Sequence, residues 1–299
     1  MKIVVTGSLG HIGKPLIQEL VRKRHLVTVI SSNPEKQKDI EAFGATAAIG
    51  SLNNVDFLTD VFAGSDAVYC MVPPDFSQPD QVFYYQNMGT IYANAIGKSG
   101  VKRIVHLSSY GAHLPSGTGF ITGSHRIEQI LNAIPGIHLT HIRPTFFYYN
   151  LLAFVDMIKA AGFIGAVYGG EDRLTMVSPI DIADAVAEEL EITTNTNLIR
   201  YVASDDRTCN EIANVLGKAI GISNLRWLAL PEEQVMQALL ERGIPENAAN
   251  NLVELGNAIH TGRLREDYNL HTLILGKVKL EDYAVEFAKV FGSNKHQQQ

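Results

Sequence analysis

Apolar positions alternate between short β-branched runs and helical spacings along the first half of the chain. Ile3, Val4 and Val5 form the first run, and a helical pattern follows over residues 14–22. Further strands are expected at 25–30, 45–49, 66–72, 101–109 and 137–143, and further helices at 35–43, 55–62, 81–98 and 126–133. Strands that alternate with helices need crossover connections. We therefore expect an α/β fold with a doubly wound parallel sheet of the Rossmann type.

Three glycines join the first expected strand to the first expected helix as Gly-x-x-Gly-x-x-Gly. The first permits a tight turn, the second lets a pyrophosphate approach the backbone, and the third lets the helix pack closely on the strand. Unpaired N–H groups at the start of the helix would hold the pyrophosphate. Because of this context the stretch favours NAD(P) binding over a plain tight turn. The expected contacts are Gly7, Ser8, Leu9, Gly10, His11, Ile12 and Gly13.

Beyond residue 150 the pattern becomes mostly helical and shows no second glycine fingerprint. Helices are expected at 151–161, 182–190, 210–220, 231–242, 245–261 and 280–290, and strands at 176–181 and 199–203. We expect an NAD(P)-binding Rossmann domain at 1–150, with its sheet completed by segments from 176–205. A smaller, mostly helical C-terminal substrate or lid lobe is expected at 151–291, followed by a disordered tail at 292–299.

Composition and charge exclude several classes of partner. Hydrophobic residues make up 46%, which is typical of a globular protein. The net charge of −6 is spread without blocks, so neither nucleic acid nor a membrane is an expected partner. No signal peptide or membrane-spanning run is evident, and a cytoplasmic location is expected. Cys70 lies in an apolar run and is interpreted as a core residue, and the ten histidines lack metal-ligand spacing, so no metal is expected.

Six motifs are spread over nearly the whole chain: Thr6–Gly13, Ser108-Ser109, Glu128–Leu131, Ile142–Asn150, Asp181–Asp184 and Leu280–Phe287. Together they resemble the NmrA-like family of atypical short-chain dehydrogenases/reductases. The resemblance implies a Rossmann fold that binds NAD(P). It leaves the reaction open, because that family includes quinone and dye reductases and also redox sensors that bind NAD(P) without turning it over.

The residues after the second expected strand favour NADP over NAD, although NAD remains possible. An acidic residue there would hold the 2′-hydroxyl of NAD. This chain instead has Ser31, Ser32 and Asn33, with Lys36 one turn later, and these suit a 2′-phosphate. The alternative is that Ser-Ser-Asn-Pro is only a turn. Further expected cofactor contacts are Ser51, Leu52, Met71, Val72, Pro73, Pro144 and Thr145.

The resemblance places the superfamily's catalytic Tyr-x-x-x-Lys pair on Phe120 and Ser124 of this chain. Neither side chain can donate a proton as an activated tyrosine does. Ser109 is a candidate hydrogen-bond donor to a substrate carbonyl, and Tyr110 and His125 are candidate acids. His125 also fits a solvated first turn of a helix.

Aromatic residues follow the sixth expected strand. The cluster 146–149 offers apolar surface on which a flat acceptor could stack, with Phe146, Phe147 and Tyr148 as the expected contacts. The alternative is that some of these rings pack the C-terminal lobe. We therefore expect an NAD(P)H-dependent oxidoreductase that passes hydride to a small aromatic or conjugated acceptor, as a monomer or homodimer. The alternative is a non-catalytic NADP(H)-binding redox sensor that acts through a protein partner.

Overall fold

The computed structural model describes residues 1–75, 77–192, 198–271 and 274–293, which form two compact units. The first unit comprises residues 1–115, 121–144 and 182–201. The second comprises 116–120, 145–181 and the chain from 202 onward. The chain thus passes between the units several times, and residues 182–201, from the segment expected to complete the sheet, belong to the first unit. Of the expected tail, residues 292 and 293 end the last helix, and 294–299 lie outside the described residues.

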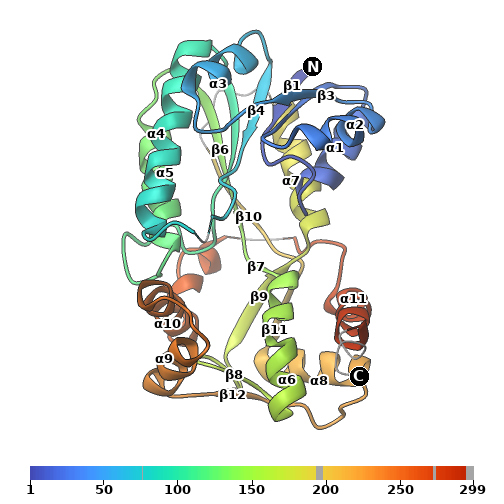
Figure 1. The fold of residues 1–299 in the computed structure, drawn as a ribbon, viewed down its shortest axis with the longest axis vertical. Helices are drawn as coiled ribbons and strands as arrows, with labels where there is room; N and C mark the ends of the chain where they lie inside the picture. The colour runs from blue at the N-terminus through green and yellow to red at the C-terminus, as the bar shows by residue number, and fades with distance from the viewer. Residues whose placement is uncertain (76, 193–197, 272–273, 294–299) are drawn as a thin grey trace. The chain divides into compact units, whose positions relative to one another are not determined.

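A seven-stranded sheet with the order β10-β6-β5-β4-β1-β2-β3 forms the middle of the first unit. Its strands are β1 (Lys2–Val5), β2 (Leu26–Ser31), β3 (Thr46–Ile49), β4 (Ala67–Cys70), β5 (Arg103–Leu107), β6 (His138–Pro144) and β10 (Leu198–Val202). Every pairing from β6 across to β3 is parallel. The predicted doubly wound Rossmann-type sheet is confirmed (Figure 1).

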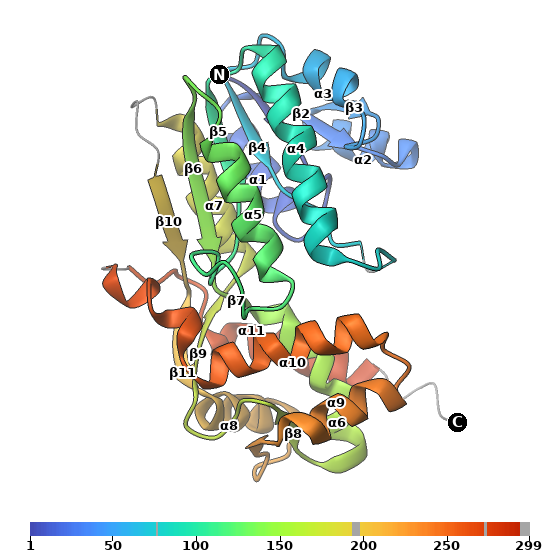
Figure 2. The same ribbon diagram turned by 90° about the vertical axis from the view of Figure 1, so that its left-hand side faces the viewer.

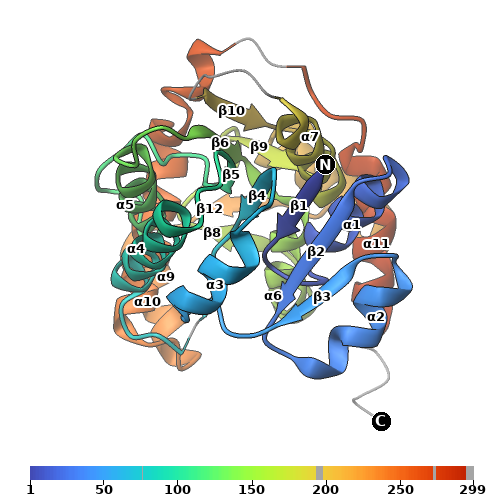
Figure 3. The same cartoon turned by 90° about the horizontal axis from the view of Figure 1, so that it is seen from above.

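Helices cover both faces of this sheet, as the view from above also shows (Figure 3). One face carries α3 (Val55–Phe62), α4 (Gln81–Ser99) and α5 (Ile121–Asn132), and the other carries α1 (Gly13–Arg22) and α7 (Pro179–Glu191). A 3₁₀ turn (Pro34–Lys36) and α2 (Gln37–Ala42) follow β2. Helix α5 begins at Ile121, five residues before its expected start. The pattern missed this first turn because Thr122, Gly123 and Ser124 are weak helix formers.

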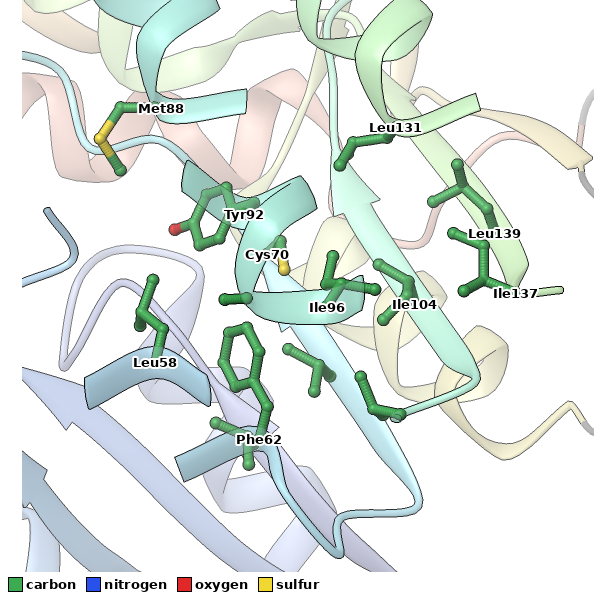
Figure 4. Close-up of a cluster of buried hydrophobic side chains, with 14 of the residues drawn as sticks. Leu58, Phe62, Cys70, Met88, Tyr92, Ile96, Ile104, Leu131, Ile137 and Leu139 are labelled. Carbon is green, nitrogen blue, oxygen red and sulfur yellow. The ribbon is translucent and has the colours of Figure 1, made fainter. Parts of the chain in front are cut away.

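Apolar side chains fill the space between the sheet and α3–α5 (Figure 4). Phe62 from α3, Tyr92 from α4 and Leu131 from α5 meet side chains of the strands in one cluster. Cys70 on β4 belongs to it, and burial raises the pKa of its thiol. The interpretation of Cys70 as a core residue is therefore confirmed.

The second unit combines small sheets with helices (Figure 2). One sheet has the order β11-β9-β7 and the other pairs β12 with β8. Its strands are β7 (Phe146–Phe147), β8 (Ile164–Ala166), β9 (Arg173–Val177), β11 (Asp205–Thr208) and β12 (Trp227–Ala229). Its helices are a 3₁₀ segment (Tyr148–Phe154), α6 (Val155–Ala161), α8 (Cys209–Ile220), α9 (Glu232–Glu241), α10 (Glu246–His260), two 3₁₀ turns (Arg263–Arg265 and Tyr268–Leu270) and α11 (Leu280–Ser293). The C-terminal region is thus largely helical, as predicted. Four of the strands were not predicted: β7, β8 and β12 have only two or three residues, and β11 (Asp-Asp-Arg-Thr) has no apolar position.

Candidate functional site

The predicted cofactor residues of the first unit gather at the carboxyl edge of its parallel sheet. The glycine loop follows β1, the segment 71–73 follows β4, and the segment 32–36 follows β2. The strand order runs outward in opposite directions from β1 and β4. Such a topological switch point is where open α/β sheets bind ligands.

The glycine loop begins with two consecutive residues in the left-handed region. Gly7 has φ +91° and Ser8 has φ +52°, which is uncommon for a residue with a side chain. The Ser8 hydroxyl oxygen is buried and has no hydrogen-bond partner within the described residues. Gly10, two residues later, is exposed. A buried hydroxyl without a partner beside exposed loop backbone fits a bound phosphate group, so the residues present suit the pyrophosphate of a dinucleotide.

The three glycines have different neighbours. A Cβ on Gly7 would lie 2.9 Å from Cγ and Sδ of Met71, and a Cβ on Gly13 would collide with the carbonyl oxygen of Ser8. A Cβ on Gly10 would meet only the carbonyl oxygen of Gly7, at 3.3 Å. The third glycine therefore lets the helix approach the loop that directly follows β1.

The segment after β4 is held beside the loop from two sides. The main-chain N–H of Met71 donates to Thr6 Oγ1 (2.9 Å), at the end of β1. From α4, the Tyr92 hydroxyl donates to the Met71 carbonyl (2.6 Å) and the Tyr84 hydroxyl donates to the Pro73 carbonyl (3.0 Å). Polar groups of the core thus fix this main chain.

Some polar side chains of the turn after β2 form hydrogen bonds within the turn. Ser31 is buried, and its hydroxyl exchanges hydrogen bonds with the main chain of Asn33 (3.3 Å). Asn33 Oδ1 accepts from the N–H of Glu35 (2.9 Å) and caps the 3₁₀ turn. Ser31 and Asn33 therefore stabilise the turn itself. Ser32 is exposed and Lys36 is half-buried.

Other expected cofactor contacts are engaged within the protein. Ser51 is exposed but its Oγ accepts from the N–H of Asn53 (3.2 Å), and Leu52 packs against the core cluster together with the buried Val72. Thr145 is buried, and both its N–H (3.1 Å) and its hydroxyl (3.4 Å) donate to the Val202 carbonyl. The Thr145 and Val72 side chains are thus occupied in packing and internal bonding, not open to a ligand.

The candidate catalytic residues lie after β5 and at the start of α5. The Ser109 hydroxyl donates to the Tyr110 carbonyl (3.3 Å), and Tyr110 is 7% exposed with its N–H donating to Pro144 O (3.0 Å). His125 Nδ1 lies 2.9 Å from the carbonyl oxygen of Ala112. Because a carbonyl only accepts, Nδ1 carries the proton and Nε2 of neutral His125 holds the lone pair.

The positions of the superfamily dyad flank the start of α5. Phe120 ends the segment assigned to the second unit, and Ser124 is 6% exposed in the first turn of the helix. One turn later, Glu128 accepts hydrogen bonds from Ser108 and from Arg143. The motif residues of the family resemblance thus form a buried structural network, while the dyad positions offer no proton donor.

Tyr148 corrects one expectation about substrate contacts. Its side chain is fully buried, its ring stacks on Tyr283 (centroids 5.2 Å apart), and its hydroxyl donates to the Val278 carbonyl (3.1 Å). Burial is the largest of the causes that raise the pKa of Tyr148. Tyr148 therefore packs the second unit, as the alternative interpretation proposed.

Two neighbouring rings stack on each other at the start of the second unit. Phe147 and Tyr149 are half-buried and stack with centroids 5.1 Å apart and planes inclined by 23°. Phe146 is also half-buried. Tyr149 belongs to the aromatic cluster 146–149 that was expected to offer apolar surface, and it lies in the 3₁₀ segment that follows β7.

A histidine pair lies in the core of the first unit. His106 on β5 and His141 on β6 are paired in register, with their Nδ1 atoms 3.0 Å apart and their rings edge to face. Burial lowers the pKa of each to about 3, so both are neutral at pH 7. Within the described residues no three His, Cys, Asp or Glu side chains converge as a metal site, and no helix is long and apolar enough to cross a membrane.

Comparison with solved structures shows the same fold in known reductases. The triphenylmethane reductase of Citrobacter sp., complexed with NADP(H), superimposes with a TM-score of 0.76 at 21% identity, over 96% of this chain and 99% of that one. The NADPH-dependent quinone oxidoreductase of Escherichia coli, complexed with NADPH, gives 0.75 at 20% identity, over 98% and 100%.

Sequence comparison extends the likeness. The NAD(P)H azoreductase of Xenophilus azovorans is 27% identical over 256 residues, 85% of each chain. The (4-alkanoyl-5-oxo-2,5-dihydrofuran-3-yl)methyl phosphate reductase of Streptomyces griseus is 26% identical over 244 residues, 81% of this chain and 82% of the relative. The sequence profile of the NmrA-like family matches residues 1–271. The chain therefore belongs to the NmrA-like family.

Proposed function

We propose that the protein is an NAD(P)H-dependent reductase of the atypical short-chain type, with its dinucleotide held at the glycine loop of the first unit. The observation that carries this proposal is the buried Ser8 hydroxyl without a partner next to the exposed Gly10, at the switch point of the sheet. Its relatives include an NAD(P)H azoreductase, and two structures of the same fold are named as complexes with NADP(H) or NADPH.

NADP is the preferred cofactor in this proposal. No acidic residue follows β2 before Glu35, so nothing there would repel a 2′-phosphate or hold a 2′-hydroxyl in the manner of NAD enzymes. Ser32 is exposed and can donate a hydrogen bond, and Lys36 adds a positive charge one turn later. No arginine stands at 31–36 to clamp a 2′-phosphate with two hydrogen bonds, so the preference for NADP is not absolute. In this proposal NAD binds the same site more weakly.

The acceptor in this proposal is a small aromatic or conjugated molecule, such as a quinone or a dye. Bound NADPH would supply the hydride. This choice is supported by the relatives and by structures of the same fold, which include an azoreductase, a quinone oxidoreductase and a triphenylmethane reductase. Ser109 supplies a hydroxyl at the end of β5 that can hydrogen-bond a carbonyl or azo group.

Protonation of the reduced acceptor does not depend on a tyrosine–lysine pair in this scheme. His125 has its Nδ1 proton committed to Ala112, which orients the ring. Its Nε2 can carry a second proton when the ring is charged, and solvent can deliver the proton otherwise. The chain's main contribution to the reaction is then the positioning of cofactor and acceptor.

A non-catalytic redox sensor remains the second candidate. It is favoured by Phe120 and the buried Ser124 at the dyad positions, which leave NADP(H) binding intact but remove the usual proton donor. Such a protein would report its NADP(H) occupancy to a protein partner.

Turnover of NADPH separates the two candidates. The purified protein is mixed with NADPH and a panel of quinones, azo dyes and triphenylmethane dyes, and oxidation is followed at 340 nm. The reductase proposal expects at least one acceptor to raise the rate about tenfold or more above the protein-free rate. Tight NADPH binding with background rates throughout the panel would defeat the reductase proposal and favour the sensor.

A further inference from the structure

The thioether of Met71 fills the space that the missing side chain of Gly7 leaves open. A Cβ on Gly7 would lie 2.9 Å from Cγ, 2.9 Å from Sδ and 3.7 Å from Cε of Met71. The end of this side chain therefore rests against the first glycine of the loop. Because hydrogen bonds from Tyr92 and to Thr6 hold the Met71 main chain, the residue cannot withdraw by a small backbone shift.

Met71 differs from the other five methionines in combining access to solvent with contact to this loop. Met88 and Met176 are buried, and the sulfur of Met157 accepts a hydrogen bond from the N–H of Gly165. Met1 is the exposed first residue. Met236 on α9 is half-buried like Met71 but belongs to the second unit, which makes it a matched comparison.

We infer that Met71 is a site of reversible oxidation by hydrogen peroxide or organic peroxides, and that its oxidation weakens binding of the dinucleotide. The inference rests on the proposed function, since it requires nucleotide at the glycine loop. In the reaction the peroxide O–O bond breaks and an S–O bond forms at Sδ. The sulfur gives up two electrons, and the second peroxide oxygen leaves as water or an alcohol.

The geometry explains why the sulfoxide would be incompatible with the loop. The added oxygen enlarges a group that already touches the Cβ position of Gly7, and it makes that group polar. Gly7 and the adjacent Ser8 hold left-handed conformations on which the shape of the loop depends. Oxidation thus displaces the backbone that holds the pyrophosphate, and bound nucleotide in turn shields Met71.

The two cysteines do not offer an alternative route for the same peroxide effect. Cys70, next to Met71, and Cys209 are both buried, and burial raises the pKa of each thiol. Peroxide reacts with the thiolate, so both are poor targets. Dithiothreitol reverses early cysteine oxidation and leaves methionine sulfoxide intact, whereas methionine sulfoxide reductases reverse the latter.

The test treats the full-length protein with hydrogen peroxide, measures sulfoxide at each methionine by peptide mass spectrometry, and titrates NADP⁺ by calorimetry. The inference expects the loss of high-affinity sites to follow the fraction of Met71 sulfoxide, with affinity of the oxidised form about tenfold weaker. Saturating NADP⁺ should slow oxidation of Met71 and leave that of Met236 unchanged. Methionine sulfoxide reductases should restore binding, and dithiothreitol should not.

Two variants are each compared with their own untreated sample. Met71→Leu should keep its affinity after peroxide, whereas Met236→Leu should lose affinity as the wild type does. Failure of Met71 to oxidise, or unchanged affinity once it is oxidised, would overturn the inference. The comparison of oxidised with untreated wild-type protein tests the inference even if Met71→Leu does not fold. Untreated protein that binds no NADP⁺ would overturn the proposed function as well, while binding that peroxide leaves untouched overturns only the inference.

Discussion

Arg143 and Glu128 form a two-pronged ion pair inside the first unit, with Nε 2.9 Å from Oε1 and Nη2 2.6 Å from Oε2. Both side chains are less than 5% exposed. Burial alone would lower the pKa of Arg143, but the hydrogen bonds and charge of Glu128 outweigh it and raise that pKa. The pair joins α5 to β6, and Arg143 also donates to the Tyr201 hydroxyl of β10 (3.0 Å).

Glu128→Ala should destabilise the protein by about 3–5 kcal/mol, because it leaves the Arg143 guanidinium buried without its partner. Urea unfolding followed by far-UV circular dichroism measures the change. Glu19→Ala is the matched control: it removes the Arg22–Glu19 pair, whose arginine is largely exposed, and should cost less than about 1 kcal/mol. Equal losses in the two variants would contradict a structural role for the buried pair.

Gly13→Ala should weaken nucleotide binding and lower the melting temperature, because its Cβ would collide with the Ser8 carbonyl at the turn of the loop. Gly97→Ala is the control, since Gly97 lies in α4 and its Cβ would meet no atom within 4 Å. That substitution should stabilise the protein by roughly 0.5–1 kcal/mol. Differential scanning fluorimetry with and without NADP⁺ reports both effects. A Gly13→Ala protein as stable as Gly97→Ala would refute the close approach of helix and loop.

The His106–His141 pair predicts acid lability of the first unit. The folded pKa of each is about 3, below the ordinary 6.5, so the unfolded chain binds more protons between these values. The stability present above pH 6.5 is therefore lost as the pH falls through 6.5 toward 3, by up to about 1.4 kcal/mol per pH unit for each histidine.

Urea unfolding at pH 7, 6, 5 and 4 measures this loss. The single variants His106→Asn and His141→Asn should each flatten the pH dependence by about half, since each removes one proton-binding group from the unfolded chain. A wild-type stability that stays constant from pH 7 to pH 4 would contradict the neutral, buried state of the pair.

Lys36→Glu should weaken NADP⁺ about tenfold and NAD⁺ much less, because the substitution puts a negative charge near the expected 2′-phosphate. Lys38→Glu, two residues further on and exposed, is the control for a general change of surface charge. Calorimetric titrations of NADP⁺ and NAD⁺ give the affinity of each variant relative to the wild type for both nucleotides. Equal losses for NADP⁺ and NAD⁺ in Lys36→Glu would show that the preference has another origin.

The sequence pattern predicted the Rossmann part of the fold because its strands are short apolar runs and its helices have regular apolar spacing. Strands β1–β6 and helices α1, α3 and α4 lie within a few residues of their expected ranges. The hydrophobic pattern did not predict elements whose position depends on tertiary contacts. The strand β7 has only two residues, and the first turn of α5 contains weak helix formers, so neither shows a periodic pattern.

The candidate site was predictable to the extent that it depends on backbone. The spacing of the glycines predicts the loop from the sequence alone. Whether a polar or aromatic side chain contacts a ligand or packs inside the protein depends on neighbours far away in the sequence. Ser31 turns to Asn33 and Tyr148 stacks on Tyr283, and neither contact leaves a local signal. The contact of Met71 with Gly7 likewise joins the segments after β4 and β1, which are distant in the sequence.

Titration of NADPH into the wild type and into Gly10→Val tests the central claim most directly. Gly10 is exposed and its Cβ would meet only the Gly7 carbonyl, so the variant should fold, with a melting temperature near that of the wild type in the absence of nucleotide. Its side chain would occupy pyrophosphate space, so affinity should fall about a hundredfold or more. Saturable binding by the wild type and its loss in Gly10→Val is the predicted result. Equal affinity in a folded Gly10→Val protein would contradict the assignment of the glycine loop as the dinucleotide site.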